Sequence, residues 1–382
     1  MTRLLLKNIQ LVTLEEVKKN YGILINDTVI EKVFPLTENL PQADTVLDGQ
    51  GALATAGLID LHIHGFGGYG PELGTPEALL KMSEALARHG VTAFCPTLYC
   101  AQPEKMKELL SRLVPVIGQE KGARILGFHL EGPFISPLKA GAMKPQDMAA
   151  PDVHILEELY QAAQGNLLLM TLAPELENIG PVIDFCLRHH IVPQAGHTNA
   201  TYEEFNRGVA QGVTHATHVF NAMRAFNHRE PGAAGAVLMN PAVSCEIIAD
   251  GVHVHPQLVS FLCRLKKPEQ IVLITDALTP TAQEKGPFIA NGDRVIFEGG
   301  VWRRETDHVI TGSALTLPQA VANLVSWGCP LTQAVQYATY NPAQLLQLKN
   351  RGQLAPGFQA DITLLQADFS PKATLINGTL IN

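Results

Sequence analysis

The sequence predicts an α/β protein in which a TIM-type (β/α)8 barrel is joined to a small β-sandwich domain formed by both chain termini. Three observations support this prediction. Eight short apolar runs alternate with amphipathic segments, both ends of the chain contain hairpin signals, and polar side chains lie at the ends of the apolar runs. The chain has 382 residues, which is enough for a barrel of about 250 residues and a small second domain.

Both ends of the chain contain short runs of strand-forming residues. In the segment 23–33, two such runs flank Asn26-Asp27, which predicts a hairpin turn at that pair. Near the other end, Asn377-Gly378 lies between two further runs. Asn-Gly is the strongest short hairpin signal, because both residues tolerate the positive φ of a type I′ turn. The termini are therefore expected to be β structure.

Neither end is long enough to bury a core of its own. We therefore expect residues 1–52 and 354–382 to pair into one small β domain, and residues 53–353 to form the barrel. Two separate edge ribbons on the main body are the alternative for the terminal segments.

Strand-like runs recur through the central part of the chain and show little alternation of polar and apolar residues, as is typical of buried parallel strands. Helical segments separate them, and those at 75–90 and 201–212 begin with an N-capping Thr and end with Gly. Eight such units predict a TIM barrel. A doubly wound open sheet is the alternative, but it does not explain the polar residues described below. The eight runs are 56–65, 91–98, 124–132, 167–175, 191–198, 213–222, 243–253 and 270–277.

Composition narrows the class of protein. Hydrophobic residues make up 46% and charged residues 17% of the chain, which excludes a disordered or coiled-coil protein. The formal net charge is −8, so no nucleic-acid partner is expected. The N-terminal segment lacks the features of a signal peptide, and no run reaches the roughly 18 apolar residues of a membrane span. With six scattered cysteines and no CxxC pair, we expect reduced thiols in a cytoplasmic protein that binds no membrane.

Ionisable side chains lie at or near the ends of most of the apolar runs. In a TIM barrel, the carboxyl ends of all strands meet at one mouth, where active sites lie. A single histidine there would more often be structural, whereas several at one mouth favour a functional site. The residues are His62, His64, Glu131, His197, His218, Asp250, His253 and Asp276.

Five of these residues have the chemistry of metal ligands. His62 and His64 are two residues apart, so both imidazoles lie on the same side of an extended strand and can bind one ion. Glu131 adds a carboxylate able to bridge two ions, and His197 and His218 add two neutral nitrogens. Imidazole and carboxylate ligands without cysteine suit zinc, or iron, in a site with an open position for water.

Three further residues could act on a substrate. Asp276 follows the eighth run, where a carboxylate beside activated water can serve as general base and then general acid. The alternative for Asp276 is a helix N-cap. Arg229 and His253 could bind an anion, Arg229 through its bidentate guanidinium fork. A surface salt bridge is the alternative for Arg229.

Together these motifs resemble the N-acetylglucosamine-6-phosphate deacetylases of the amidohydrolase superfamily, over essentially the whole chain. The resemblance rests on AGLIDLHIHG, GVTAFCPTL, GFHLEGPFISPLKAGA, TLAPE, AGHTNAT, THVFNAM, HREPG, IADGVH, LITDA and TGSALTL, in the order and spacing of that family. It implies a metal-dependent barrel on a small β domain, usually in a homodimer.

The resemblance also implies roles for individual residues. It makes Glu131, His197 and His218 the primary metal ligands, His62 and His64 the ligands of a second ion that Glu131 bridges, and Asp276 the catalytic aspartate. Arg229 and His253 match a phosphate-binding pair, and in some relatives the segment corresponding to His228-Arg229 extends across the dimer into the partner's site. The sugar-contacting positions correspond to Ala142, Asn221, Ala222, Ile310 and Gly312.

One position departs from the pattern of the family. The family's KxGAHP loop offers a histidine that polarises the acetamide carbonyl, whereas this chain reads KAGAMKP with Met143 at that place. A thioether cannot donate a hydrogen bond to a developing oxyanion. Either a second metal ion supplies that polarisation, or the substrate or the activity of this protein differs.

The resemblance implies metal-dependent hydrolysis of the N-acetyl group of N-acetylglucosamine 6-phosphate, giving glucosamine 6-phosphate and acetate. One or two divalent ions per subunit are expected, and the partners are a phosphorylated amino sugar and a second copy of the chain. Two alternatives remain at this point. One is an amidohydrolase that acts on a different N-acyl amino sugar, and the other is a non-catalytic homologue that only binds a sugar phosphate.

Overall fold

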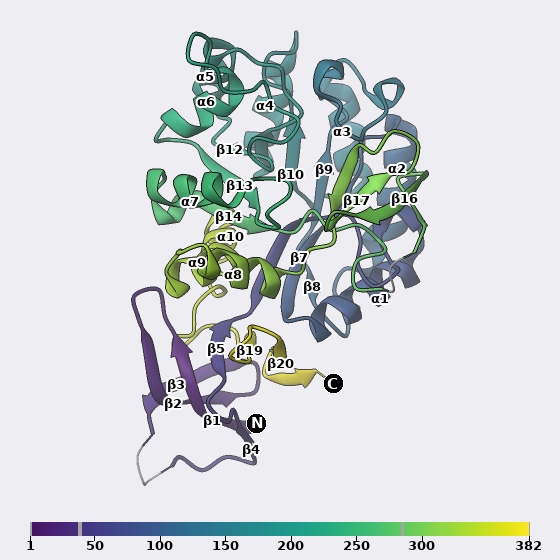
Figure 1. Cartoon of the computed structure of the whole chain (residues 1–382). Helices are drawn as coiled ribbons and strands as arrows, with labels where there is room; N and C mark the ends of the chain where they lie inside the picture. Colours follow the sequence, from purple (N-terminus) through teal and green to yellow (C-terminus); the bar gives the residue numbers. More distant parts are fainter. Residues whose placement is uncertain (1, 37–39, 284–285, 382) are drawn as a thin grey trace.

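The computed structural model describes residues 2–36, 40–283 and 286–381. Its strands form three sheets: a barrel of parallel strands, a mixed sheet from the two termini, and a small antiparallel sheet. Figure 1 shows the barrel with its surrounding helices above the terminal sheet. Within these ranges, none of the helices has the length and apolar character that a membrane span requires.

Eight parallel strands form the barrel, and each predicted run contains one of them. Neighbouring strands follow the chain order from the first to the eighth, and the short β8 (Arg124–Ile125) adds a second partner to β7. The TIM-barrel prediction is therefore confirmed and the open sheet is excluded. The strands are β6 (Leu58–Ile63), β7 (Val91–Leu98), β9 (Phe128–Glu131), β10 (Leu167–Leu172), β11 (Val192–Ala195), β12 (His215–Ala216), β13 (Ser244–Ile248) and β14 (Ile271–Ile274).

The barrel closes between its first and last strands. The backbone N–H of Asp276 donates to the carbonyl of His62 at 2.9 Å, and His64 N–H donates to Ala277 O at 2.9 Å. Deeper in the barrel, the Thr275 hydroxyl donates to the buried Asp60 carboxylate at 2.6 Å. These bonds hold the ends of β6 and β14 side by side, so the residues that follow both strands lie at the same mouth.

Helices cover the outer face of the barrel and bury apolar residues against it. The two helices expected from their caps are present: Thr75 accepts from Ala78 N–H at 3.3 Å, and Thr201 forms a capping box with Glu204. The helices are α1 (Pro76–Arg88), α2 (Pro103–Leu113), α3 (Val153–Ala162), α4 (Ile179–Arg188), α5 (Tyr202–Ala210), α6 (Gly232–Met239), α7 (Pro256–Leu265), α8 (Leu317–Ser326), α9 (Leu331–Ala338) and α10 (Tyr340–Leu345).

Strands from both ends of the chain form one continuous mixed sheet, as expected for a small β domain and not for separate edge ribbons. The first stretch of the predicted barrel range 53–353, β5 (Leu53–Ala56), belongs to this sheet and not to the barrel. The sheet order is β21-β20-β19-β5-β1-β2-β3, with β4 beside β1, so the two termini meet where β5 pairs with β19. The strands are β1 (Arg3–Val12), β2 (Val17–Asn26), β3 (Val29–Pro35), β4 (Thr45–Asp48), β5 (Leu53–Ala56), β19 (Ile362–Leu365), β20 (Pro371–Ile376) and β21 (Thr379–Ile381).

The hairpin signals at the termini give turns close to the predicted positions. The second hairpin turns at Asn377-Gly378, where both residues have positive φ, as predicted. The first turns one residue later than predicted, at Asp27-Thr28, because Asn26 still pairs with Val29 in the ladder. The sheet has its own apolar core, and its edge is tied back to the C-terminal segment where Ile30 N–H donates to Phe358 O at 2.8 Å.

A third sheet follows β14 and was not predicted. It comprises β15 (Phe288–Ala290), β16 (Asp293–Glu298), β17 (Val301–Arg304) and β18 (Ile310–Ser313), in antiparallel order. Ser313 N–H donates to the carbonyl of Asp276 at 2.9 Å, which fixes the end of this sheet against the barrel mouth. It lies beside the barrel, where β16 and β17 are seen in Figure 1.

Candidate metal centre and active site

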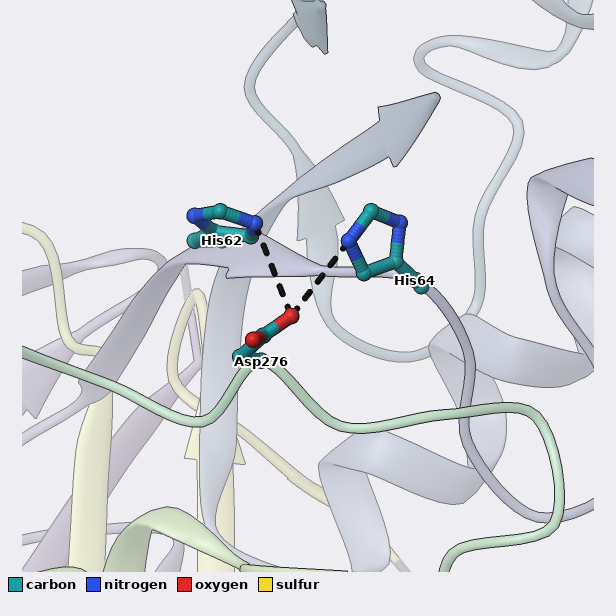
Figure 2. Close-up of side chains that lie close together, drawn as sticks. All are labelled: His62, His64 and Asp276. Carbon is teal, nitrogen blue, oxygen red and sulfur yellow. Dashed lines mark ion pairs between the residues drawn. The ribbon is translucent and has the colours of Figure 1, made fainter. Parts of the chain in front are cut away.

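The histidines of the first strand and the aspartate after the last strand meet at the barrel mouth. His62 Nε2 lies 3.6 Å and His64 Nε2 lies 3.3 Å from the same oxygen of Asp276, Oδ1. Figure 2 shows both imidazoles facing this carboxylate from β6 and the segment after it. The closure of the barrel between β6 and β14 therefore brings together residues that are more than half the chain apart.

Glu131 lies between two groups of histidines. Its Oε1 is 3.0 Å from His197 Nε2 and 3.0 Å from His218 Nε2. Its Oε2 is 3.1 Å from His64 Nε2. Oε1 also lies 3.5 Å from His62 Nε2, so this one carboxylate contacts histidines of both groups.

Hydrogen bonds on the far side of each ring fix the orientation of three imidazoles. His197 Nδ1 lies 2.9 Å from Lys139 O, His64 Nδ1 lies 3.2 Å from Thr97 O, and His62 Nδ1 lies 3.0 Å from a Glu246 oxygen. Because carbonyl and carboxylate oxygens only accept, the proton of each ring is assigned to Nδ1. The Nε2 lone pairs therefore face the cluster.

Three residues of the cluster have a left-handed backbone. His197, His218 and Asp276 have φ values of 47°, 27° and 51°. Such values are uncommon for residues other than glycine and mark positions that the surrounding structure holds under strain. Each residue lies just beyond a strand, where the reversed backbone aims its side chain over the barrel mouth.

The cluster combines buried carboxylates with imidazoles, and this determines the direction of their pKa shifts. Burial raises the pKa of Glu131, but the imidazoles, His62 first among them, outweigh it and hold this pKa well below its usual range. Asp276 behaves alike: burial raises its pKa, His62 and His64 lower it, and the result is a lowered pKa. Both shifts favour the anionic form of these carboxylates.

The donors fit a pair of divalent cations. Two groups, Glu131–His197–His218 and His62–His64–Asp276, each have ligand atoms within 4.8 Å of one another. His62 Nε2 and Glu131 Oε2 are buried without a hydrogen-bond partner, which is costly unless an ion binds them. The ligand type, nitrogen and carboxylate oxygen without sulfur, suits zinc or iron. The role of each residue as a ligand stays a prediction.

A pocket of about 300 Å³ opens beside the cluster. Met143 also faces this pocket and is 7% exposed. His253 lies in the pocket wall, and its Nδ1 is 2.6 Å from Asp250 Oδ2. Asp250 therefore orients this ring from behind. Asp250 is not part of the pocket lining. All five predicted sugar-contacting positions line the pocket: Ala142, Asn221, Ala222, Ile310 and Gly312.

Two predicted substrate residues lie away from this pocket. His228 and Arg229 are exposed on the loop before α6 and are not part of its lining. No ion pair of Arg229 is found within the described ranges, so the surface salt bridge considered from the sequence is not formed there. Within one chain, the structure does not bring these two residues to the pocket.

Several buried polar residues behind the cluster were missed by the sequence analysis. Glu246 contacts His62, Asp60 anchors β6 to β14, and His129 lies beside His62 with a ring-centroid distance of 4.6 Å. Tyr99 stacks on His64 at 3.8 Å and lines the pocket. The available signal was a charged residue in the middle of an apolar run, as in LIDLHI and SCEII, because such residues are rarely buried without a partner.

The chain matches the model of the amidohydrolase family over residues 53–381, which is most of its length. The chain belongs to the amidohydrolase family. It is 31% identical to the N-acetylglucosamine-6-phosphate deacetylase of Lysinibacillus sphaericus, with 87% of each chain covered. It is also 31% identical to the N-acetylgalactosamine-6-phosphate deacetylase of Escherichia coli O157:H7, with 97% of each chain covered.

Solved structures agree with these relatives. This amidohydrolase is similar to a variant of the N-acetyl-D-glucosamine-6-phosphate deacetylase of Mycobacterium smegmatis, solved in complex with N-acetyl-D-glucosamine-6-phosphate. The TM-score is 0.92 at 31% sequence identity, with 100% of each chain covered. The resemblance expected from the sequence motifs is therefore confirmed at the level of the family and of the whole fold.

Proposed function

We propose that this amidohydrolase hydrolyses the N-acetyl group of N-acetylglucosamine 6-phosphate, giving glucosamine 6-phosphate and acetate. The full-length similarity to deacetylases of phosphorylated amino sugars supports this function. The observation that carries it is the buried Glu131, which contacts histidines of both groups beside a pocket of sugar size. The proposed deacetylase activity is thus supported by the contacts of Glu131 as well as by the similarity to known deacetylases.

We propose that Glu131, His197 and His218 hold one ion and that His62 and His64 hold a second, with Glu131 as the bridge. Zinc is the preferred metal and iron is the alternative, because both accept nitrogen and carboxylate ligands. Bound ions of this kind lower the pKa of water and polarise a carbonyl oxygen. The unpartnered His62 Nε2 and Glu131 Oε2 support a site that a cation completes.

Asp276 is the proton carrier in this proposal. Its carboxylate accepts a proton from the water that attacks the acetamide carbonyl, and it then donates that proton to the amine nitrogen as the C–N bond breaks. Burial raises the pKa of Asp276, but His62 and His64 lower it by more, and the lowered pKa keeps this carboxylate ionised. Water supplies the oxygen and the proton, so the products are acetate and the free amine.

A second copy of the chain completes the phosphate site in this proposal. The loop that bears His228 and Arg229 adjoins an apolar groove of about 840 Å³ between α6 and α7. Phe226, Met239, Phe261 and Leu265 in this groove are between 44% and 56% exposed, which is unusual for large apolar side chains that remain in water. A homodimer that covers the groove would carry Arg229 toward the partner's pocket, where His253 lies in the wall.

The galactosamine derivative is the second candidate substrate, because the relative from Escherichia coli O157:H7 is as similar as the glucosamine enzymes are. We propose that the protein works in the cytoplasm, and its six free cysteines support this. The test is a deacetylation assay on both phosphorylated sugars and on unphosphorylated N-acetylglucosamine, combined with metal analysis. Binding without acetate release in metal-replete protein would leave only a sugar-phosphate-binding role.

A further inference from the structure

Glu246 lies in the middle of β13, inside the barrel and directly behind the metal-binding histidines. It is fully buried, and its Oε2 accepts from two residues at once. One is the ring of His62, whose Nδ1 is 3.0 Å away, and the other is the backbone N–H of His218, 3.2 Å away. These two residues belong to different groups of the candidate metal centre.

The contact with His62 determines what the opposite nitrogen of that ring can do. Because a carboxylate oxygen accepts, it holds the proton on Nδ1, which leaves the Nε2 lone pair facing Glu131 and Asp276. A negative charge behind the ring also makes Nε2 a stronger donor to a metal. No other hydrogen bond to the His62 ring is found in the described part of the chain.

The contact with His218 acts on the backbone. His218 has a φ of 27°, a strained value for a residue with a side chain. Its N–H points into the barrel toward Glu246, and the next N–H, of Val219, donates to the backbone carbonyl of Glu246 at 2.9 Å. Glu246 therefore stabilises the reversed backbone that aims the His218 ring at Glu131.

Glu246 could instead be a metal ligand itself, since His62, His129 and Glu246 also have ligand atoms within 4.8 Å of one another. The geometry instead favours a role for Glu246 behind the ligands, in which it holds the His62 ring and does not bind an ion. His62 Nδ1 is already bound to Glu246, and the two nitrogens of His129 lie 3.3 Å from the Thr97 hydroxyl and 2.9 Å from the Thr171 hydroxyl.

We propose that Glu246 is a positioning residue that orients one ligand of each metal subsite through a single oxygen, and that the ion bound by His62 and His64 depends on it most. The proposal rests on the proposed two-ion centre. The effect is uneven because Glu246 contacts the ring of His62 but only the backbone of His218, and the primary subsite keeps Glu131 and His197 when Glu246 is removed. Replacing such an outer partner typically weakens metal binding by about 10–100-fold.

The test compares Glu246→Gln, which keeps an oxygen acceptor without the charge, with Glu246→Leu, which removes both. Glu120→Leu is the matched control, because Glu120 is a buried carboxylate that accepts from a backbone N–H, of Ile125, and is not part of either ligand group. The affinities of both ions are measured by chelator competition. The spin coupling of the cobalt-substituted centre reports independently whether two ions share one bridge.

We expect wild-type protein to bind two coupled ions. Glu246→Leu should lose the second ion and the coupling and retain the first, and Glu246→Gln should weaken the second ion by roughly 10-fold. If Glu246→Leu does not fold, the proposal is tested by whether Glu246→Gln weakens the second ion selectively. The proposal would be overturned if Glu246→Leu and Glu120→Leu lose the same affinity for the second ion, or if neither Glu246 variant changes that affinity. A third ion bound to the wild-type protein would also overturn it. Wild-type protein with two coupled ions but no deacetylation would contradict the proposed function and leave this one intact.

Discussion

The carboxylate of Asp276, just beyond β14, lies between His62 and His64. One substitution can remove its charge without changing its size. Asp276→Asn keeps the size and removes the basicity. We expect metal and substrate binding to be retained and kcat to fall by at least ~10²-fold, the lower end for lost general acid–base catalysis. Steady-state kinetics with metal analysis measures this. Turnover close to that of wild type would make Asp276 a structural cap.

Met143 faces the pocket. It occupies the position of the histidine in the KxGAHP loop, which the resemblance described above expects to polarise the substrate carbonyl. In His62→Ala/His64→Ala protein, which should lose the second ion and most activity, we expect Met143→His to restore part of the rate. The gain should be about 2 kcal/mol of transition-state stabilisation, because a donor to the oxyanion returns. Met143→Leu in the same background is the control. A gain in neither variant, with the primary ion still bound, would mean that position 143 does not face the reacting carbonyl.

At the level of residues, the sequence revealed those at strand ends and missed those inside strands. His62 and His64 could be predicted to share a site because strand side chains alternate with period two, and they do face one carboxylate. Glu246 could not be assigned, because its partners come from β6 and from the segment after β12, and only the closed barrel brings them together. Nothing local in SCEII identifies them.

At the level of elements, the antiparallel sheet β15–β18 forms one wall of the pocket. Its core contains Trp302, which is 2% exposed and packs edge-on against Phe288 and Phe297. We expect Trp302→Ala to destabilise this sheet by about 3–5 kcal/mol. Since the sheet carries Ile310 and Gly312 but no candidate ligand, KM should rise while metal content stays at the wild-type value.

Trp327→Ala is the matched control, because Trp327 is the other tryptophan and lies at the end of α8, outside the pocket lining. Its KM should be that of wild type. A loss of metal in Trp302→Ala, without a change in KM, would contradict a role of this sheet in the pocket wall.

The barrel strands could be predicted because buried parallel strands are nearly continuous apolar runs, whereas the β15–β18 sheet has mixed, half-exposed strands. Its turns were nevertheless visible in the sequence. Asn291-Gly292 and Gly299-Gly300 both have positive φ and join neighbouring strands, as such pairs do in tight hairpins. The signal that succeeded at Asn377-Gly378 was thus present here too.

At the level of the whole molecule, the exposed position of Arg229 predicts dependence on a second chain. Arg229→Ala should weaken phosphorylated substrate by roughly 10–100-fold in KM, because a hydrogen bond to a charged group is lost. Unphosphorylated substrate should be unaffected. Kinetics on both substrates measures the difference, and an equal loss on both would contradict a phosphate contact.

If the contact crosses the dimer, mixing Arg229→Ala protein with Glu131→Ala protein should create sites with the wild-type KM for phosphorylated substrate, because one pocket of each heterodimer receives an intact Glu131 and an intact Arg229. Size-exclusion chromatography with light scattering tests the dimer itself. If heterodimers form and the mixture keeps the raised KM of Arg229→Ala protein, Arg229 serves its own pocket. Neither the sequence nor a single chain could decide this, because the answer lies in the arrangement of two copies.

Because β5 pairs with β19, the terminal sheet cannot be completed until nearly the whole chain has been synthesised. Ala56 pairs with Ile362, so ribosomes that add ~5–20 residues per second need tens of seconds to make the partner of β5 after β5 itself. During that time β1 and β2 present Leu6, Ile23 and Ile25, later part of a closed core, beside an unpaired strand edge. We therefore expect the nascent chain to be most prone to self-association before its last strands leave the ribosome.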